Sequence, residues 1–230
     1  MKALGRLAVV AAVVVAGIAL GAAAGEKIWT DRFFMNKSDL SPTGTNPYFI
    51  LQPGYQLHLT SGDEELTVTV LNETETIDGV QTRVVEERET EGGTLSEVSR
   101  NYFAISKSNN TVFYFGEDVD NYDETGKVKG HGGGWRAGVS GARAGVMMPG
   151  IPLIGARYYQ ELAAGVAMDR AEIVSLTEAL STPAGTFKNV LKIEETTPLE
   201  PDEKEYKLYA AGVGLLQDSS LKLHRYGYVK

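Results

Sequence analysis

The chain has 230 residues, of which 43% are hydrophobic, and a formal net charge of −8 at pH 7. It contains no cysteine, which excludes disulfide bonds, thiolate metal sites and a cysteine nucleophile. No basic run accompanies the negative net charge. Nucleic acid is therefore not expected as a partner, because neutralising phosphates requires clustered lysine and arginine.

Residues 1–24 have the three-part layout of a secretory signal peptide. Lys2 and Arg6 precede an unbroken apolar run, and Ala22–Ala24 forms a small-residue cleavage pattern. We therefore predict cleavage after Ala24 and an exported protein that is periplasmic or extracellular. The alternative is a retained membrane anchor over residues 7–24, a length at the short end of what spans a bilayer. In either case, membrane contact is expected only through this segment.

Residues 25–46 are predicted to be a tether, and residues 47–230 one antiparallel β domain. From Tyr48 onward, apolar and polar residues alternate with the period of two that indicates half-buried strands. Asp78-Gly79 lies between two such stretches and predicts a tight hairpin. The charged residues from Glu86 to Glu89 are interpreted as a solvated sheet edge, where charge discourages aggregation.

The middle of the domain has a different composition. Residues 116–134 are acidic and then glycine-rich, and residues 135–152 are rich in glycine and apolar residues, so we predict a long loop. Residues 170–181 have some helical spacing, but the following Thr182–Gly185 turn favours a strand. About ten strands result. They predict a mostly β fold, with a single antiparallel, strongly curved sheet or open barrel whose interior is filled or holds a ligand.

Two sequence stretches carry a family resemblance. One is the Pro183–Phe187 turn (PAGTF) before a strand, and the other is the Tyr209–Gly214 strand end (YAAGVG). With them, the chain resembles a group of uncharacterised exported bacterial β proteins. At the level of fold it is also similar to the curved-sheet lipoprotein carriers of the bacterial envelope. The resemblance implies export and a β fold, and it implies no particular cargo.

The predicted loop carries a cluster of carboxylates that includes Glu117, Asp118, Asp120 and Asp123. Several carboxylate oxygens on a flexible backbone are the ligands that calcium prefers, so calcium is the cofactor this pattern would hold. The spacing does not match an EF-hand. The alternative is a solvated acidic loop in an acidic protein.

A ligand site is predicted where the long loop meets the next strand. Its members are Trp135, Arg136, Tyr158, Gln160 and Glu161, which combine aromatic, basic and acidic groups. No nucleophile motif accompanies them, and only three histidines occur in the chain. We therefore expect a non-enzymatic protein.

Three functions are compatible with these observations. The first is an envelope protein that binds a small apolar or amphipathic ligand inside a curved sheet. The second is a calcium-stabilised interaction or structural module at the cell surface, with another envelope protein as its partner. The third is a hydrolase of envelope polymers, for which Glu117 and Glu161 would be a carboxylate pair. We expect the first function, because a strongly curved sheet has an interior.

Overall fold

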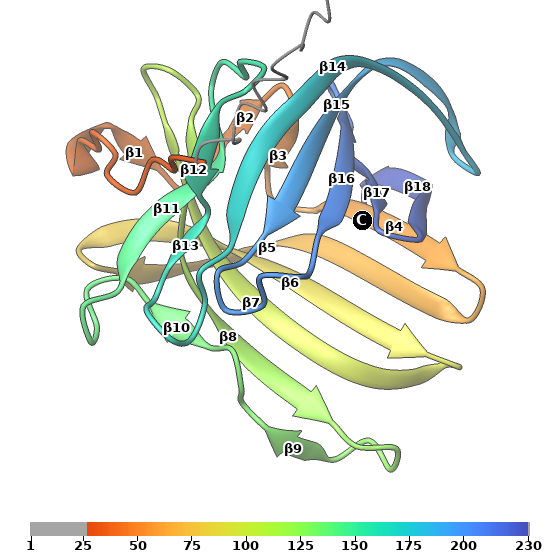
Figure 1. Cartoon of the computed structure of the whole chain (residues 1–230). Coiled ribbons are helices and arrows are strands. Elements are labelled where there is room, and N and C mark those ends of the chain that lie inside the picture. The colour runs from red at the N-terminus through yellow and green to blue at the C-terminus, as the bar shows by residue number, and fades with distance from the viewer. Residues whose placement is uncertain (1–26, 230) are drawn as a thin grey trace, which may run out of the picture.

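The computed structural model describes residues 27–229 (Figure 1). The predicted signal peptide lies outside the described residues. Strands dominate the described chain, and its single named helical element is a short 3-10 turn, η1 (Lys37–Asp39). Between residues 27 and 229, no helix has the length and apolar character needed to cross a membrane.

The strands in chain order are β1 (Leu40–Ser41), β2 (Gly44–Asn46), β3 (Phe49–Leu51), β4 (Tyr55–Ser61), β5 (Glu64–Ile77), β6 (Val80–Glu91), β7 (Thr94–Ser106), β8 (Val112–Tyr122), β9 (Val128–Gly130), β10 (Trp135–Arg136), β11 (Arg143–Met148), β12 (Arg157–Tyr159), β13 (Glu161–Leu162), β14 (Arg170–Thr182), β15 (Gly185–Thr196), β16 (Glu205–Ala210), β17 (Gly214–Asp218) and β18 (Leu221–Tyr228).

These strands form one 16-stranded antiparallel sheet and a separate two-stranded β2–β3 hairpin. The main order is β12-β14-β15-β16-β17-β18-β4-β5-β6-β7-β8-β11-β13. Its two ends, β12 and β13, are neighbours in the chain, joined through Gln160. The sheet therefore curves into a nearly closed barrel with a seam at this point, as the ribbon shows (Figure 1).

The predicted fold class is confirmed, and residues 170–182 are a strand, as expected. The strand count of about ten was too low, chiefly because the predicted long loop is not one loop. Strand β8 continues to Tyr122, and β9, β10 and β11 lie within residues 128–148. Backbone pairing with β8 orders this glycine-rich stretch, which its composition alone does not reveal.

Residues 27–46, predicted as a tether, contact the barrel at several points. The Lys27 ammonium lies 2.7 Å from a carboxylate oxygen of Glu172. Strand β1 pairs with β7. The fully buried Asn46 side chain donates hydrogen bonds to the carbonyl oxygens of Asn110 and Pro149, at 3.0 and 2.9 Å. These contacts fix the β2–β3 hairpin against the barrel.

The hydrophobic core fills the barrel interior and extends onto the outer face of β7 and β8, where Tyr102–Ile105 and Val112–Phe115 are buried without a break. Successive side chains of a strand point to opposite faces, so every second residue of the long strands faces inward. Phe115, Leu59, Ile105, Ile193 and Leu216 are among the fully buried side chains. They come from strands on both sides of the barrel, so their packing stabilises the closed shape.

Candidate functional site

Strand β8 separates the four predicted calcium ligands. Glu117 and Asp118 are consecutive residues of this strand and therefore point to opposite faces. Asp118 accepts hydrogen bonds from the Arg136 guanidinium and from the Tyr102 hydroxyl, the latter at 2.8 Å. The Arg136 guanidinium is the main favourable partner that holds the pKa of Asp118 below its usual range against the effect of burial.

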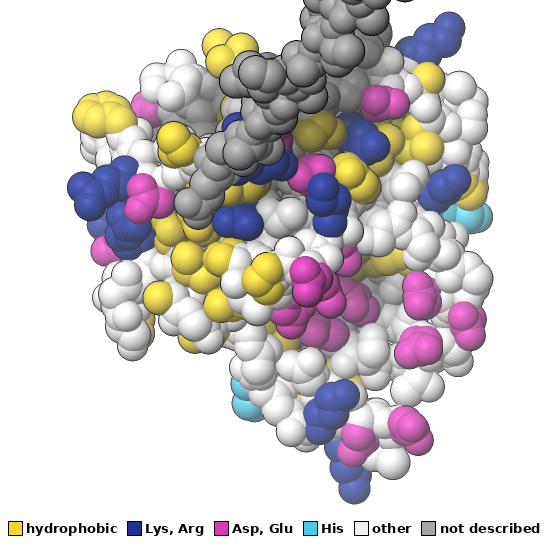
Figure 2. Space-filling model, viewed as in Figure 1, with side chains coloured by type: hydrophobic (Ala, Val, Ile, Leu, Met, Phe, Trp, Pro, Cys, Tyr) yellow, Lys and Arg dark blue, Asp and Glu magenta, His cyan; other side chains and the backbone are white. Residues whose placement is uncertain are grey.

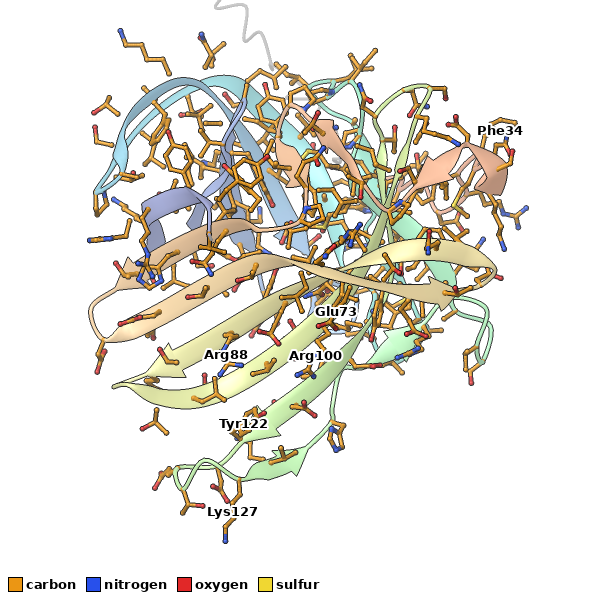
Figure 3. All side chains as sticks on the ribbon, turned by 180° about the vertical axis from the view of Figure 1, so that it is seen from behind. Phe34, Glu73, Arg88, Arg100, Tyr122 and Lys127 are labelled. Atoms are coloured by element: carbon orange, nitrogen blue, oxygen red, sulfur yellow. The ribbon has the colours of Figure 1, made fainter. Side chains whose placement is uncertain are left out.

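The other two carboxylates are engaged elsewhere. Asp120 lies 3.1 Å from the Arg100 guanidinium. Figure 3 shows Arg100 beside Arg88, and both arginines lie near the carboxylate of Glu86. Asp123 follows β8 and accepts hydrogen bonds within its own turn, including one from the Thr125 hydroxyl at 2.6 Å.

The four carboxylates were expected on one loop, but Glu117, Asp118 and Asp120 belong to strand β8 and only Asp123 lies in a turn. Among the described residues, no group of three or more histidine, aspartate or glutamate side chains is placed to hold a metal ion. Strand geometry is the reason, because it sends neighbouring carboxylates to opposite faces and to different partners.

The five predicted ligand-binding residues also divide between the two faces. Trp135, Tyr158, Gln160 and Glu161 are buried in the interior, whereas Arg136 lies on the outer face with Asp118. The Trp135 indole donates to a Glu161 carboxylate oxygen at 3.4 Å. The Tyr158 hydroxyl is buried and has no hydrogen-bond partner among the described residues.

A polar network connects these buried residues with the centre of the barrel. The Gln160 side-chain amide donates to a Glu195 carboxylate oxygen at 2.9 Å. The other Glu195 oxygen lies 2.9 Å from the Lys207 ammonium, which also lies 3.5 Å from Asp218. Burial by itself would lower the pKa of Lys207, but the charges of Glu195 and Asp218 outweigh it and raise that pKa well above its usual value. Lys207 therefore stays charged inside the barrel.

An apolar cavity of about 70 Å³ lies beside Lys207, in the barrel interior. It lies between β4–β7 on one side and β16–β17 on the other, and residues Tyr48–Ile50 border it. Most of its wall is apolar, and its charged members are Glu87, Lys207 and Asp218. Its lining residues are Tyr48, Phe49, Ile50, Tyr55, Leu57, Val68, Val70, Val85, Glu87, Phe103, Met147, Lys207, Tyr209, Val213, Gly214, Leu215 and Asp218.

The charged end of the cavity continues into an open groove. Glu87, Lys207 and Asp218 line both. Seven acidic residues line the groove, and among the described residues that do so Lys207 is the only basic one. The acidic residues are Glu64, Glu65, Glu87, Glu89, Glu91, Glu205 and Asp218. On the face of the molecule shown in Figure 2, acidic side chains gather over the middle and toward one edge.

Burial perturbs the carboxylates on the inner face. It raises the pKa of Glu87 to about 7, and the charges of Asp218, Glu89 and Glu117 add to this effect while Lys207 opposes it. Burial likewise raises the pKa of Glu117 to about 7. It raises that of Glu161 to about 8, with a further contribution from Asp169 and Glu117. Glu87 and Glu117 are therefore only partly protonated at neutral pH, whereas Glu161 is mostly protonated.

The predicted ligand site and the cavity occupy different parts of the interior network, and the predicted ligand site stays a prediction. None of the five predicted ligand residues lines the cavity or the groove. Glu87 and Glu89 lie on the same face of β6 as Val85 and line the groove. They were interpreted as part of a solvated sheet edge; Glu89 is exposed as expected, but β6 lies between β5 and β7 and is not an edge strand. Their period-two spacing from Val85 shows that the three residues share a face, but the neighbouring Val84 is buried as well, so the sequence does not reveal which face is the interior.

Comparisons of the chain with models of protein families, with curated proteins and with solved structures found no match. The mostly β, strongly curved sheet is the part of the predicted resemblance that the structure shows. The exported family and the carrier-like cargo stay predictions.

Proposed function

We propose that this chain is an exported binding protein that holds a small amphipathic ligand inside its barrel. The supporting observation is the apolar cavity whose charged end, at Glu87, Lys207 and Asp218, continues into an open polar groove. Ligand sites in proteins are typically apolar hollows with a few converging polar groups that fix the orientation of the ligand. The groove gives such a ligand a path from solvent.

The size of the cavity limits the ligand. At about 70 Å³, the cavity is smaller than the several hundred Å³ of most small-molecule sites. It nevertheless exceeds the roughly 10–15 Å³ that one water molecule needs on the same measure. The apolar part of the ligand is therefore a short chain or a single small group, and its polar part lies at the groove.

The hydrolase hypothesis has less support. Glu117 and Glu161 both face the interior and influence each other's charge. However, neither lines the cavity or the groove, so a polymer in the groove would not lie between them.

A cavity-filling variant tests the binding proposal. Val68 lines the cavity from β5, so Val68→Phe places an aromatic ring in the space that the ligand would occupy. Thr69→Phe, whose side chain points to the other face of β5, is the matched control. We expect short amphipathic probes to shift amide NMR signals around the cavity in the wild type and in Thr69→Phe, and to lose binding in Val68→Phe. Binding that survives in Val68→Phe would refute the interior site.

Export is a separate part of the proposal. Expression of the full chain in a bacterial host with a secretory pathway, followed by intact mass measurement, tests cleavage after Ala24. A mass that retains residues 1–24 in a membrane fraction would favour the anchor instead.

A further inference from the structure

The groove carries negative charge that its own basic residue does not balance. Lys207 is shared between Glu195 and Asp218, at 2.9 and 3.5 Å. Glu87 and Glu89 form no ion pair with any other residue of the described chain. Ions in the solvent screen the charge of exposed carboxylates, whereas carboxylates near the interior are incompletely solvated by water. The groove therefore attracts a cation.

Glu87 lies at the boundary between the apolar cavity and the polar groove, where the apolar part of a ligand would meet its polar part. It lines both the cavity and the groove, and it shares the inner face of β6 with Val85. A ligand with its apolar part against Val85 therefore brings its polar group to Glu87 and to Asp218. Lys207 also lines this position, but Glu195 and Asp218 share its charge, which leaves the Glu87 carboxylate without an ion pair. Glu87 therefore complements a hydrogen-bond donor with a positive charge.

We propose that the ligand of this barrel is an organic ammonium ion with a short apolar chain, whose charged nitrogen binds Glu87 and Asp218 at the entrance of the cavity. This inference rests on the proposed binding function and specifies the class of ligand. An ammonium group provides up to three donors for the surrounding carboxylate oxygens. A bare metal ion fits less well, because the described residues place no group of three or more ligating side chains together.

Three probes of equal chain length separate this inference from the proposed function. Hexylammonium, hexanol and hexanoate differ only in the polar end, and their dissociation constants can be measured by amide NMR titration at low salt. We expect hexylammonium to bind at least about tenfold more tightly than hexanol, because a hydrogen bond to a charged group is stronger than one between neutral groups. We expect hexanoate to bind most weakly.

Glu87→Gln removes the charge and keeps the shape of the side chain. It should weaken hexylammonium binding by about tenfold and leave hexanol binding unchanged. Glu86→Gln is the matched control, because Glu86 is the preceding residue on the opposite face of β6. Circular dichroism of each variant verifies that it is folded.

The pH dependence provides a test that needs no variant. Glu87 is faced by Lys207 from β16, Asp218 from β17, Glu117 from β8 and Glu89 from its own strand. Because its pKa is raised to about 7, Glu87 ionises over the neutral range, and hexylammonium affinity should increase between about pH 6 and about pH 8. Hexanol affinity should not follow this trend.

The outcomes distinguish the two proposals. Hexanol or hexanoate binding as tightly as hexylammonium, or unchanged hexylammonium binding in Glu87→Gln, would overturn the ammonium inference and leave the interior binding site in place. A failure of all three probes to shift any cavity signal at millimolar concentration would overturn both.

Discussion

Replacing Glu161 with glutamine should make the protein more stable, and increasingly so as the pH rises. Glu161 is 9% exposed, and burial, followed by the charges of Asp169 and Glu117, raises its pKa from 4.5 to about 8. The folded chain therefore keeps a proton on this carboxyl that the unfolded chain releases. Glutamine cannot ionise, and it can still accept the hydrogen bond from the Trp135 indole.

The size of the effect follows from the linkage between protonation and folding. Below about pH 4.5 the carboxyl is protonated in both states, so the pH-dependent part of the difference between wild type and Glu161→Gln is absent. As the pH rises, the unfolded state ionises first and the wild type loses stability, until the loss is complete above about pH 8. At about 1.4 kcal/mol per pH unit, the full loss is about 5 kcal/mol, and at neutral pH it is about 3 kcal/mol.

Urea unfolding followed by tryptophan fluorescence, at several pH values between about 5 and 9, measures the free energy of unfolding of both proteins. The exposed Glu124→Gln serves as the control and should follow the wild type throughout. The reasoning would be refuted by a difference between wild type and Glu161→Gln that stays constant with pH. Such a result would mean that Glu161 is solvated and ionised in the folded protein.

Three further predictions concern the barrel framework, and each is measured by urea unfolding. Phe115 is fully buried, so Phe115→Ala should lower the free energy of unfolding by about 3–5 kcal/mol; a loss below about 1 kcal/mol would contradict its place in the core. A Cβ on Gly145 would lie 2.2 Å from the Gln160 carbonyl oxygen. Gly145→Ala should therefore force the seam apart, at a cost of at least about 1–3 kcal/mol, with faster hydrogen exchange in β11 and β13. Asn46→Ala leaves two carbonyl groups without their donor and should cost about 1–3 kcal/mol; unchanged stability would mean that water replaces the amide.

The predicted alternation was most informative where strands pair with their neighbours in the chain. The Asp78-Gly79 turn joins β5 and β6 as expected, because tight-turn chemistry and period-two spacing are local properties. Prediction was poorest over residues 116–152. There, short strands depend on pairing with β8, and glycine content alone indicates a loop.

The amino-acid sequence alone predicts a cysteine-free, acidic chain of antiparallel strands that form a strongly curved sheet, and the structure has this sheet. It also predicts which residues share a face, since side chains two positions apart point the same way. Which of the two faces is the inside depends on how distant strands pack together. Glu87 faces the interior because β16 and β17, more than one hundred residues later in the chain, close the barrel opposite β6. Local periodicity carries no information about that distant partner, so the acidic entrance of the cavity becomes visible only once the barrel has closed.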